Sequence, residues 1–80
     1  MDDVAIKARM GRALQIARER AGITQAALAD ALGTKQSAVS RLEAGQRWPS
    51  ARTLAKIMKA TRTHVIGSLL AEAEAERKSA

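Results

Sequence analysis

The sequence predicts a small, compact all-α protein of five helices, and three observations support this fold class. Hydrophobic residues make up 46% of the 80 residues, yet Phe and Tyr are absent and Trp48 is the only aromatic residue. Strands favour aromatic and β-branched side chains, so this composition disfavours a sheet. Apolar residues recur at intervals of three and four, and glycines divide the chain into segments of helical length.

Length and composition indicate one domain over residues 1–80, with a compact core at about 4–70 and a solvated helical tail at 71–80. The chain contains no cysteine, so neither a disulfide nor a thiolate metal site is expected. No apolar run has the length of a membrane span, and the acidic N-terminus does not resemble a signal peptide. We therefore expect a cytoplasmic protein that has no membrane partner.

The first helix is expected over residues 4–20. Its apolar side chains follow helical spacing and form one stripe: Ile6, Met10, Ala13, Leu14 and Ala17. Gly22 suits the left-handed end of this helix. The second helix, over residues 25–32, begins after Thr24, whose hydroxyl can cap it, and ends at Gly33.

The third helix is expected over residues 35–44, with Thr34 as its cap and Gly45 at its end. Pro49 cannot continue a helix, so residues 46–50 are a loop. Ser50 then caps a fourth helix that reaches about residue 60 and buries Leu54, Ile57 and Met58.

The fifth helix is expected to start with Thr63 as its cap. Its apolar residues again have helical spacing: Val65, Ile66, Leu69 and Leu70. Gly67 weakens this expectation by about 1 kcal/mol relative to alanine, so a short strand through residues 65 and 66 is the alternative.

Positive charge is concentrated in one part of the chain. The formal net charge is +6, and residues 35–62 hold seven lysines and arginines against the single acidic residue Glu43. The basic excess of this segment therefore equals that of the whole chain, and the remaining residues are balanced. A one-sided positive field indicates a polyanionic partner.

Residues 25–44 meet the requirements of a helix-turn-helix, in which two short helices cross at a steep angle. Ala29 is small where the helices would cross, and Gly33 can adopt the positive φ of the turn. Four apolar residues attach the pair to the core: Leu28, Leu32, Val39 and Leu42. These constraints fall at mutually consistent offsets, so the second and third helices are predicted to form this motif.

At these residues the chain resembles the lambdoid repressor and Cro-type family, also called XRE-type. The resemblance covers about residues 10–70 and depends on "GITQAALADALGTKQSAVSRLEAG", "WPS" and "LAKIMKA". It implies a five-helix, lambda-repressor-like DNA-binding domain, commonly a dimer on two-fold symmetric operators. The second helix of such domains lies across the DNA backbone, and the third enters the major groove.

The resemblance implies that Gln36, Ser37 and Arg41 contact bases. The family often has a glutamine at the position of Gln36 that reads adenine, and a glutamine amide can pair with adenine N6 and N7. Arg41 would reach guanine O6 and N7. The alternative for these three side chains is a solvated helix face.

Contacts to the phosphate backbone are implied for seven residues: Gln25, Lys35, Ser40, Arg47, Trp48, Ser50 and Arg52. Relatives with glutamines matching Gln25 and Gln36 bond the two amides to each other; a local capping role is the alternative for Gln25. For Trp48, packing against the core is favoured over a phosphate contact. Arg18 and Glu43 resemble a partly buried ion pair of the family, with a structural role.

Other residues bear on assembly and chemistry. Ile66 and Leu70 point away from the side of Val65 and Leu69, which makes them candidates for a dimer interface, with extra core packing as the alternative. Arg62 stands where the family often has glycine, which affects the geometry of the last helix. No catalytic arrangement, metal spacing or phosphate loop is found, so we expect no enzyme activity, cofactor or metal.

The sequence thus predicts a sequence-specific regulator of double-stranded DNA, a repressor acting as a homodimer. No room for an effector domain follows residue 70, so no small-molecule effector is expected. Two alternatives have the same size: an antitoxin that binds a toxin protein, and a restriction-modification controller. An architectural protein that bends DNA is disfavoured because the polar helix face lacks apolar wedges.

Overall fold

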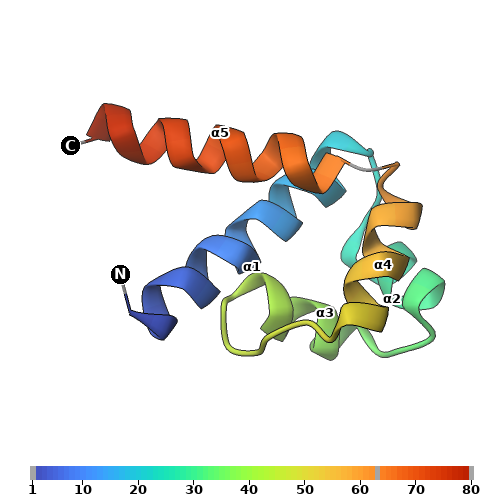
Figure 1. Ribbon diagram of the computed structural model, residues 1–80. Coiled ribbons are helices and arrows are strands. Elements are labelled where there is room, and N and C mark those ends of the chain that lie inside the picture. Colours follow the sequence, from blue (N-terminus) through green and yellow to red (C-terminus); the bar gives the residue numbers. More distant parts are fainter. Residues whose placement is uncertain (1, 63, 80) are drawn as a thin grey trace.

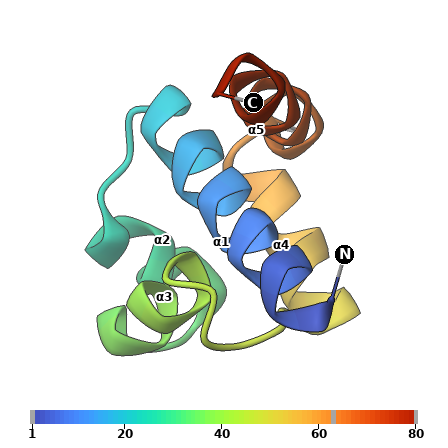
Figure 2. The same cartoon turned by 90° about the vertical axis from the view of Figure 1, so that its left-hand side faces the viewer.

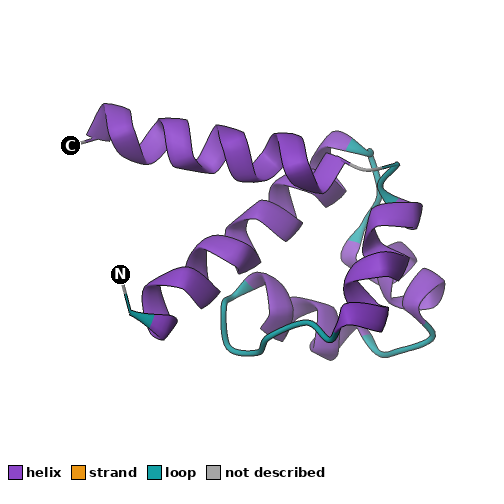
Figure 3. Ribbon diagram, viewed as in Figure 1, coloured by secondary structure: helices purple, strands orange, loops and turns teal. Residues whose placement is uncertain are grey.

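The computed structural model describes residues 2–62 and 64–79, and these residues form five helices with no strand (Figure 3). The helices are α1 (Asp3–Arg20), α2 (Gln25–Leu32), α3 (Gln36–Glu43), α4 (Ala51–Ala60) and α5 (His64–Ser79). The predicted all-α class is confirmed. The alternative of a strand at residues 65 and 66 is wrong, because both residues lie in α5. No helix within residues 2–62 or 64–79 is long and apolar enough to span a membrane.

The first helix lies at the centre of the arrangement (Figures 1 and 2). It packs against both α3 and α5, while α2 packs against α3 and α4. The helix α5 crosses the C-terminal part of α1, and the two helices diverge towards the C-terminus of α5 (Figure 1). The helix continues without a break into residues 71–79, and Arg12 Nε of α1 lies 3.8 Å from Glu72 Oε2 of α5.

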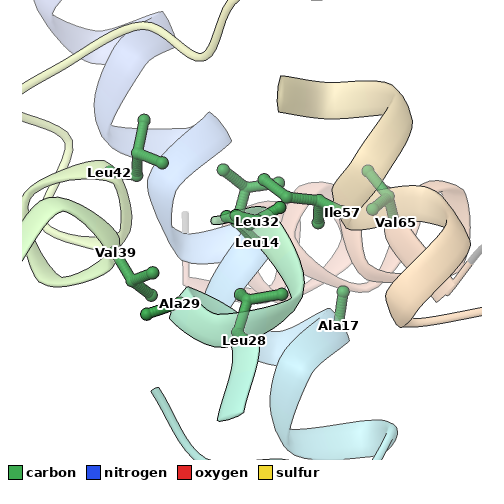
Figure 4. Packing of buried hydrophobic residues seen from close by; sticks show 9 residues of the cluster. All are labelled: Leu14, Ala17, Leu28, Ala29, Leu32, Val39, Leu42, Ile57 and Val65. Atoms are coloured by element: carbon green, nitrogen blue, oxygen red, sulfur yellow. The ribbon is translucent and has the colours of Figure 1, made fainter. Parts of the chain in front are cut away.

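Apolar side chains from all five helices meet in one core (Figure 4). The cluster consists of Leu14, Ala17, Leu28, Ala29, Leu32, Val39, Leu42, Ile57 and Val65. The predicted buried faces of α2, α3 and α4 are therefore confirmed. The prediction for Ile6 is wrong: its side chain is exposed because it lies in the N-terminal part of α1, from which α5 has diverged (Figure 1).

The ends of α2 and α3 explain one wrong prediction. Gly33 has a φ of 68°, and the Thr34 N–H donates to the Ala29 carbonyl at 2.9 Å. This turn uses Thr34 to close α2. Consequently α3 begins one residue later than expected, and its N-cap is Lys35 rather than Thr34.

The other predicted caps can be compared with the hydrogen bonds. The hydroxyl oxygens of Thr24 and Ser50 accept the N–H groups of Ala27 and Thr53, each at 3.0 Å. Both capping predictions are confirmed. The predicted cap of the fifth helix, Thr63, lies outside the described residues.

Arg62 has a φ of 55°, the left-handed conformation that L side chains adopt at a cost. Its N–H donates to the Lys59 carbonyl at 3.4 Å, as that of Gly33 does to the Asp30 carbonyl at 3.1 Å. Arg62 therefore occupies the place that a glycine takes at the end of α2. Arg62, which stands where the family often has glycine, therefore keeps the turn but adds backbone strain.

Replacing Arg62 by glycine is expected to raise the free energy of unfolding by about 1 kcal/mol, because glycine adopts this φ without steric cost. Urea unfolding followed by circular dichroism measures the change. Arg62→Ala is the matched control, since it removes the same side chain and keeps the strain. An equal gain in both variants would show that the side chain, and not the backbone, is responsible.

Candidate nucleic-acid interface

The third helix has one buried and one exposed face. Val39 and Leu42 are buried in the core, whereas Gln36, Ser37, Ser40 and Arg41 are exposed. The buried Ala29 of α2 leaves room for the two helices to approach closely, and the left-handed Gly33 sets the turn between them. Packing of the apolar face therefore fixes which side chains α3 presents to its surroundings.

A bidentate ion pair links α1 to the C-terminal end of α3. Arg18 Nε donates to Glu43 Oε2 at 2.7 Å, and Arg18 Nη2 donates to Glu43 Oε1 at 3.2 Å. The side chains are 13% and 5% exposed, respectively. The hydrogen bonds to Glu43, together with its negative charge, raise the pKa of Arg18 against the opposing effect of burial. Arg18 Nη1 also donates to the Ile23 carbonyl at 2.9 Å, which fixes the guanidinium in the α1–α2 turn.

The amides of Gln25 and Gln36 lie next to this ion pair. Gln25 Nε2 donates to Glu43 Oε1 at 3.0 Å, and Gln36 Nε2 donates to Gln25 Oε1 at 3.5 Å. The local capping role considered for Gln25 belongs instead to Thr24. The contact between Gln25 and Glu43 could not be predicted from the sequence, because residues 18 positions apart on separate helices carry no local spacing signal.

The basic segment is arranged unevenly in space. All seven lysines and arginines of residues 35–62 are exposed, and their only acidic neighbour in sequence, Glu43, is buried against Arg18. The loop after α3 and the start of α4 lie beside α3 (Figure 1). Lys35 is the N-cap of α3, Arg47 lines a hollow together with Ala38 and Leu42 of α3, and Arg52 lies in the first turn of α4. Arg62 instead lines a hollow with Arg20 and His64 at the other end of α4. The charge near α3 is therefore smaller than the sequence cluster suggested.

A family model described as helix-turn-helix, of the Cro/C1 type, matches residues 14–66, which is more than half of the chain. The chain belongs to this family. It is accordingly an XRE-type, DNA-binding regulator, and its motif consists of α2 and α3. No curated protein matches the chain.

In this XRE-type domain, Trp48 and Ser50 border a hollow of about 210 Å³ beside α3. Trp48 is 49% exposed, and it lines this hollow together with Leu32, Ala38 and Leu42. The Ser50 hydroxyl accepts the Thr53 N–H and donates to Thr53 Oγ1 at 3.0 Å, so its proton is engaged in the helix cap. In the structure, the main role of the Ser50 side chain is therefore to cap the N-terminus of α4.

The dimer candidates lie on α5 of the XRE-type domain. Ile66 is 60% exposed and Leu70 is 67% exposed. The alternative of extra core packing is therefore wrong, because Val65 fills the core position on this part of the helix. Leu69, which was expected on the side of Val65, is 36% exposed, whereas Val65 is buried. The chain thus exposes an apolar strip on a helix that lies away from the motif (Figure 1).

Proposed function

We propose that this regulator is a sequence-specific repressor that binds a palindromic double-stranded operator as a homodimer. The observation that carries the proposal is the polar face of α3, which is exposed while the opposite face is fixed in the core. An α-helix fits the major groove, where each base pair presents a distinct pattern of donors and acceptors. A protein with this function would act in the cytoplasm, bound to DNA.

The base-reading residues are Gln36, Ser37 and Arg41. Gln36 stands at the first position of α3, and the N-terminal residues of a recognition helix meet base edges. Its amide suits adenine, whereas the guanidinium of Arg41 suits guanine. Ser37 follows Gln36 directly in α3, and its exposed hydroxyl can donate or accept a hydrogen bond.

Contacts to the backbone supply affinity that does not depend on sequence. The three cations proposed for these contacts are exposed: Lys35 is the N-cap of α3, Arg47 lies in the loop after α3, and Arg52 lies in the first turn of α4. Ser40 lies on the polar face of α3. Gln25 contacts Gln36 at the start of α3, and Trp48 lines the hollow beside α3. Ser50 is at the N-terminus of α4, where free N–H groups attract a phosphate. Together these residues would hold the domain on the two sugar-phosphate strands.

Dimerisation would use the apolar strip of α5 that includes Ile66 and Leu70. Large exposed aliphatic side chains gain free energy when a second copy covers them, at about 25 cal/mol per Å² of buried apolar surface. Two copies related by a two-fold axis would read half-sites about 34 Å apart. No cofactor, metal or small-molecule effector is part of this proposal.

Gln36→Ala is expected to relax the base preference at one position of each half-site, at a cost of about 1–3 kcal/mol in discrimination. Binding sites are first selected from random duplexes, and the variant is then titrated on the selected site and on its single-base variants. The loss should be confined to one position per half-site. An equal loss on every duplex would contradict a base-reading role for Gln36.

Arg52→Ala is expected to weaken binding to all duplexes alike, because a phosphate contact carries no base information. The slope of log K against log salt concentration should fall by about 1. The same titration at several salt concentrations measures both effects. A change in base preference without a change in salt slope would assign Arg52 to the bases instead.

The alternative of an antitoxin is favoured by one observation, the exposed strip of Ile66 and Leu70, which a toxin protein could also cover. The mass of the purified complex distinguishes the homodimeric repressor from the antitoxin. A homodimer on DNA has the mass of two chains plus one duplex, whereas a bound toxin adds the mass of a further chain. A restriction-modification controller would bind DNA by the same chemistry, and the genes next to the operator would identify it.

A further inference from the structure

The buried carboxylate of Glu43 is connected to the exposed amide of Gln36 by a continuous series of hydrogen bonds. Arg18 donates twice to Glu43, Gln25 Nε2 donates to Glu43 Oε1, and Gln36 Nε2 donates to Gln25 Oε1. Exposure rises along the series, from the 5% exposed side chain of Glu43 through the partly buried Gln25 to the exposed Gln36. A group in the protein interior is thereby linked to the proposed contact with a base.

The carboxylate decides which way the amide of Gln25 faces. An ionised carboxylate has acceptors only, so the atom of Gln25 that lies 3.0 Å from Glu43 Oε1 must be the amide nitrogen. The Gln25 oxygen then points away from Glu43 and towards Gln36. Rotating the Gln25 amide by half a turn would place two acceptor oxygens against each other, which costs a hydrogen bond and adds repulsion.

The orientation of Gln25 in turn orders the amide of Gln36. An oxygen at Gln25 can only accept, so Gln36 turns its NH₂ group to it and uses one of its two N–H bonds there. The Gln36 oxygen and the second N–H remain for the groove. This is the pair of groups that adenine needs, since N6–H donates and N7 accepts.

We infer that Glu43 is a positioning residue for DNA recognition: through Gln25 it sets the donor and acceptor order of the Gln36 amide and thereby its preference for adenine. This inference rests on the proposed function, because it assumes that Gln36 meets a base. Arg18 donates two hydrogen bonds to Glu43, holds the carboxylate in place and acts one step further back. The ion pair thus contributes to base specificity as well as to packing.

The test compares Glu43→Gln with wild type in the titration on single-base variants of the selected site. The neutral amide no longer dictates the orientation of Gln25, so discrimination at the Gln36-dependent position should fall by about 2-fold to 10-fold, the value of one hydrogen bond. Discrimination at the other positions should stay the same. The ratio between duplexes is the readout, because partial unfolding weakens binding to all duplexes equally.

A second variant separates positioning from structure. Gln25→Leu removes the bridging amide and leaves the Arg18–Glu43 pair intact. It should lose the same discrimination as Glu43→Gln, and the double variant should lose no more than either single variant. If Glu43→Gln does not fold, the double variant Arg18→Met, Glu43→Leu replaces it in the titration: retained preference overturns the inference, and a loss at the Gln36-dependent position supports it.

Gln36→Ala in the same titration tells the two possible failures apart. If Gln36→Ala changes no base preference, the proposed contact of Gln36 with a base is wrong. If Gln36→Ala changes the preference but Glu43→Gln and Gln25→Leu do not, then only the positioning role is wrong. A merely structural ion pair would lower stability and affinity and would leave the ratio between duplexes unchanged.

Discussion

Gly11→Ala is expected to lower the free energy of unfolding by about 2–3 kcal/mol, although alanine is the better helix former by about 1 kcal/mol. A Cβ atom at residue 11 would lie 2.6 Å from the carbonyl oxygens of Leu42 and Glu43 and 2.7 Å from the nitrogen of Gly45. These are backbone atoms, so no side-chain rotation can relieve the contact. The two helices α1 and α3 would have to move apart.

Gly67→Ala is the matched control, because Gly67 is likewise inside a helix. Its added Cβ would meet only Arg20 Nη1, at 3.4 Å, and that atom is the flexible end of a long side chain. The control should therefore gain up to about 1 kcal/mol from helix propensity. Urea unfolding of both variants checks the prediction. Equal stability of the two variants would contradict a close contact between α1 and α3.

Local signals in the sequence were sufficient for most of the fold. Gly33 and Thr24 mark the two ends of α2, and the spacing of Leu28, Leu32 and Val39 identifies the buried faces. These features act within one or two helical turns, so a single sequence contains them. The N-cap of α3 was misplaced by one residue because Thr34 is used by the preceding turn, which residue types alone do not reveal.

Features that depend on contacts between distant segments were harder to predict. Gly11 lies among residues with helical spacing, and nothing near it in sequence indicates that a backbone lies against it. The bond from Gln25 to Glu43 likewise appears only once α2 and α3 are placed. The charge cluster of residues 35–62 was visible as a composition, but composition does not tell that Arg62 lies at the far end of α4.

Arg18→Met is expected to lower the free energy of unfolding by about 3–5 kcal/mol, because it leaves the carboxylate of Glu43 buried without its partner. Methionine retains most of the aliphatic part of the side chain, so the change measures mainly the loss of charge and hydrogen bonds. Since small domains have a total stability of about 5–15 kcal/mol, the variant should be marginally folded. Thermal and urea unfolding measure the effect.

The double variant Arg18→Met, Glu43→Leu is expected to recover most of that loss and to lie within about 1 kcal/mol of wild type, since a buried ion pair is often replaced by apolar residues without cost. If it is as unstable as Arg18→Met alone, the pair contributes net stability and its presence needs no further reason. If stability recovers, folding does not account for the pair. If the stable double variant also binds its operator with weakened preference at the Gln36-dependent position, that result would show that the ion pair serves to orient Gln25 and Gln36.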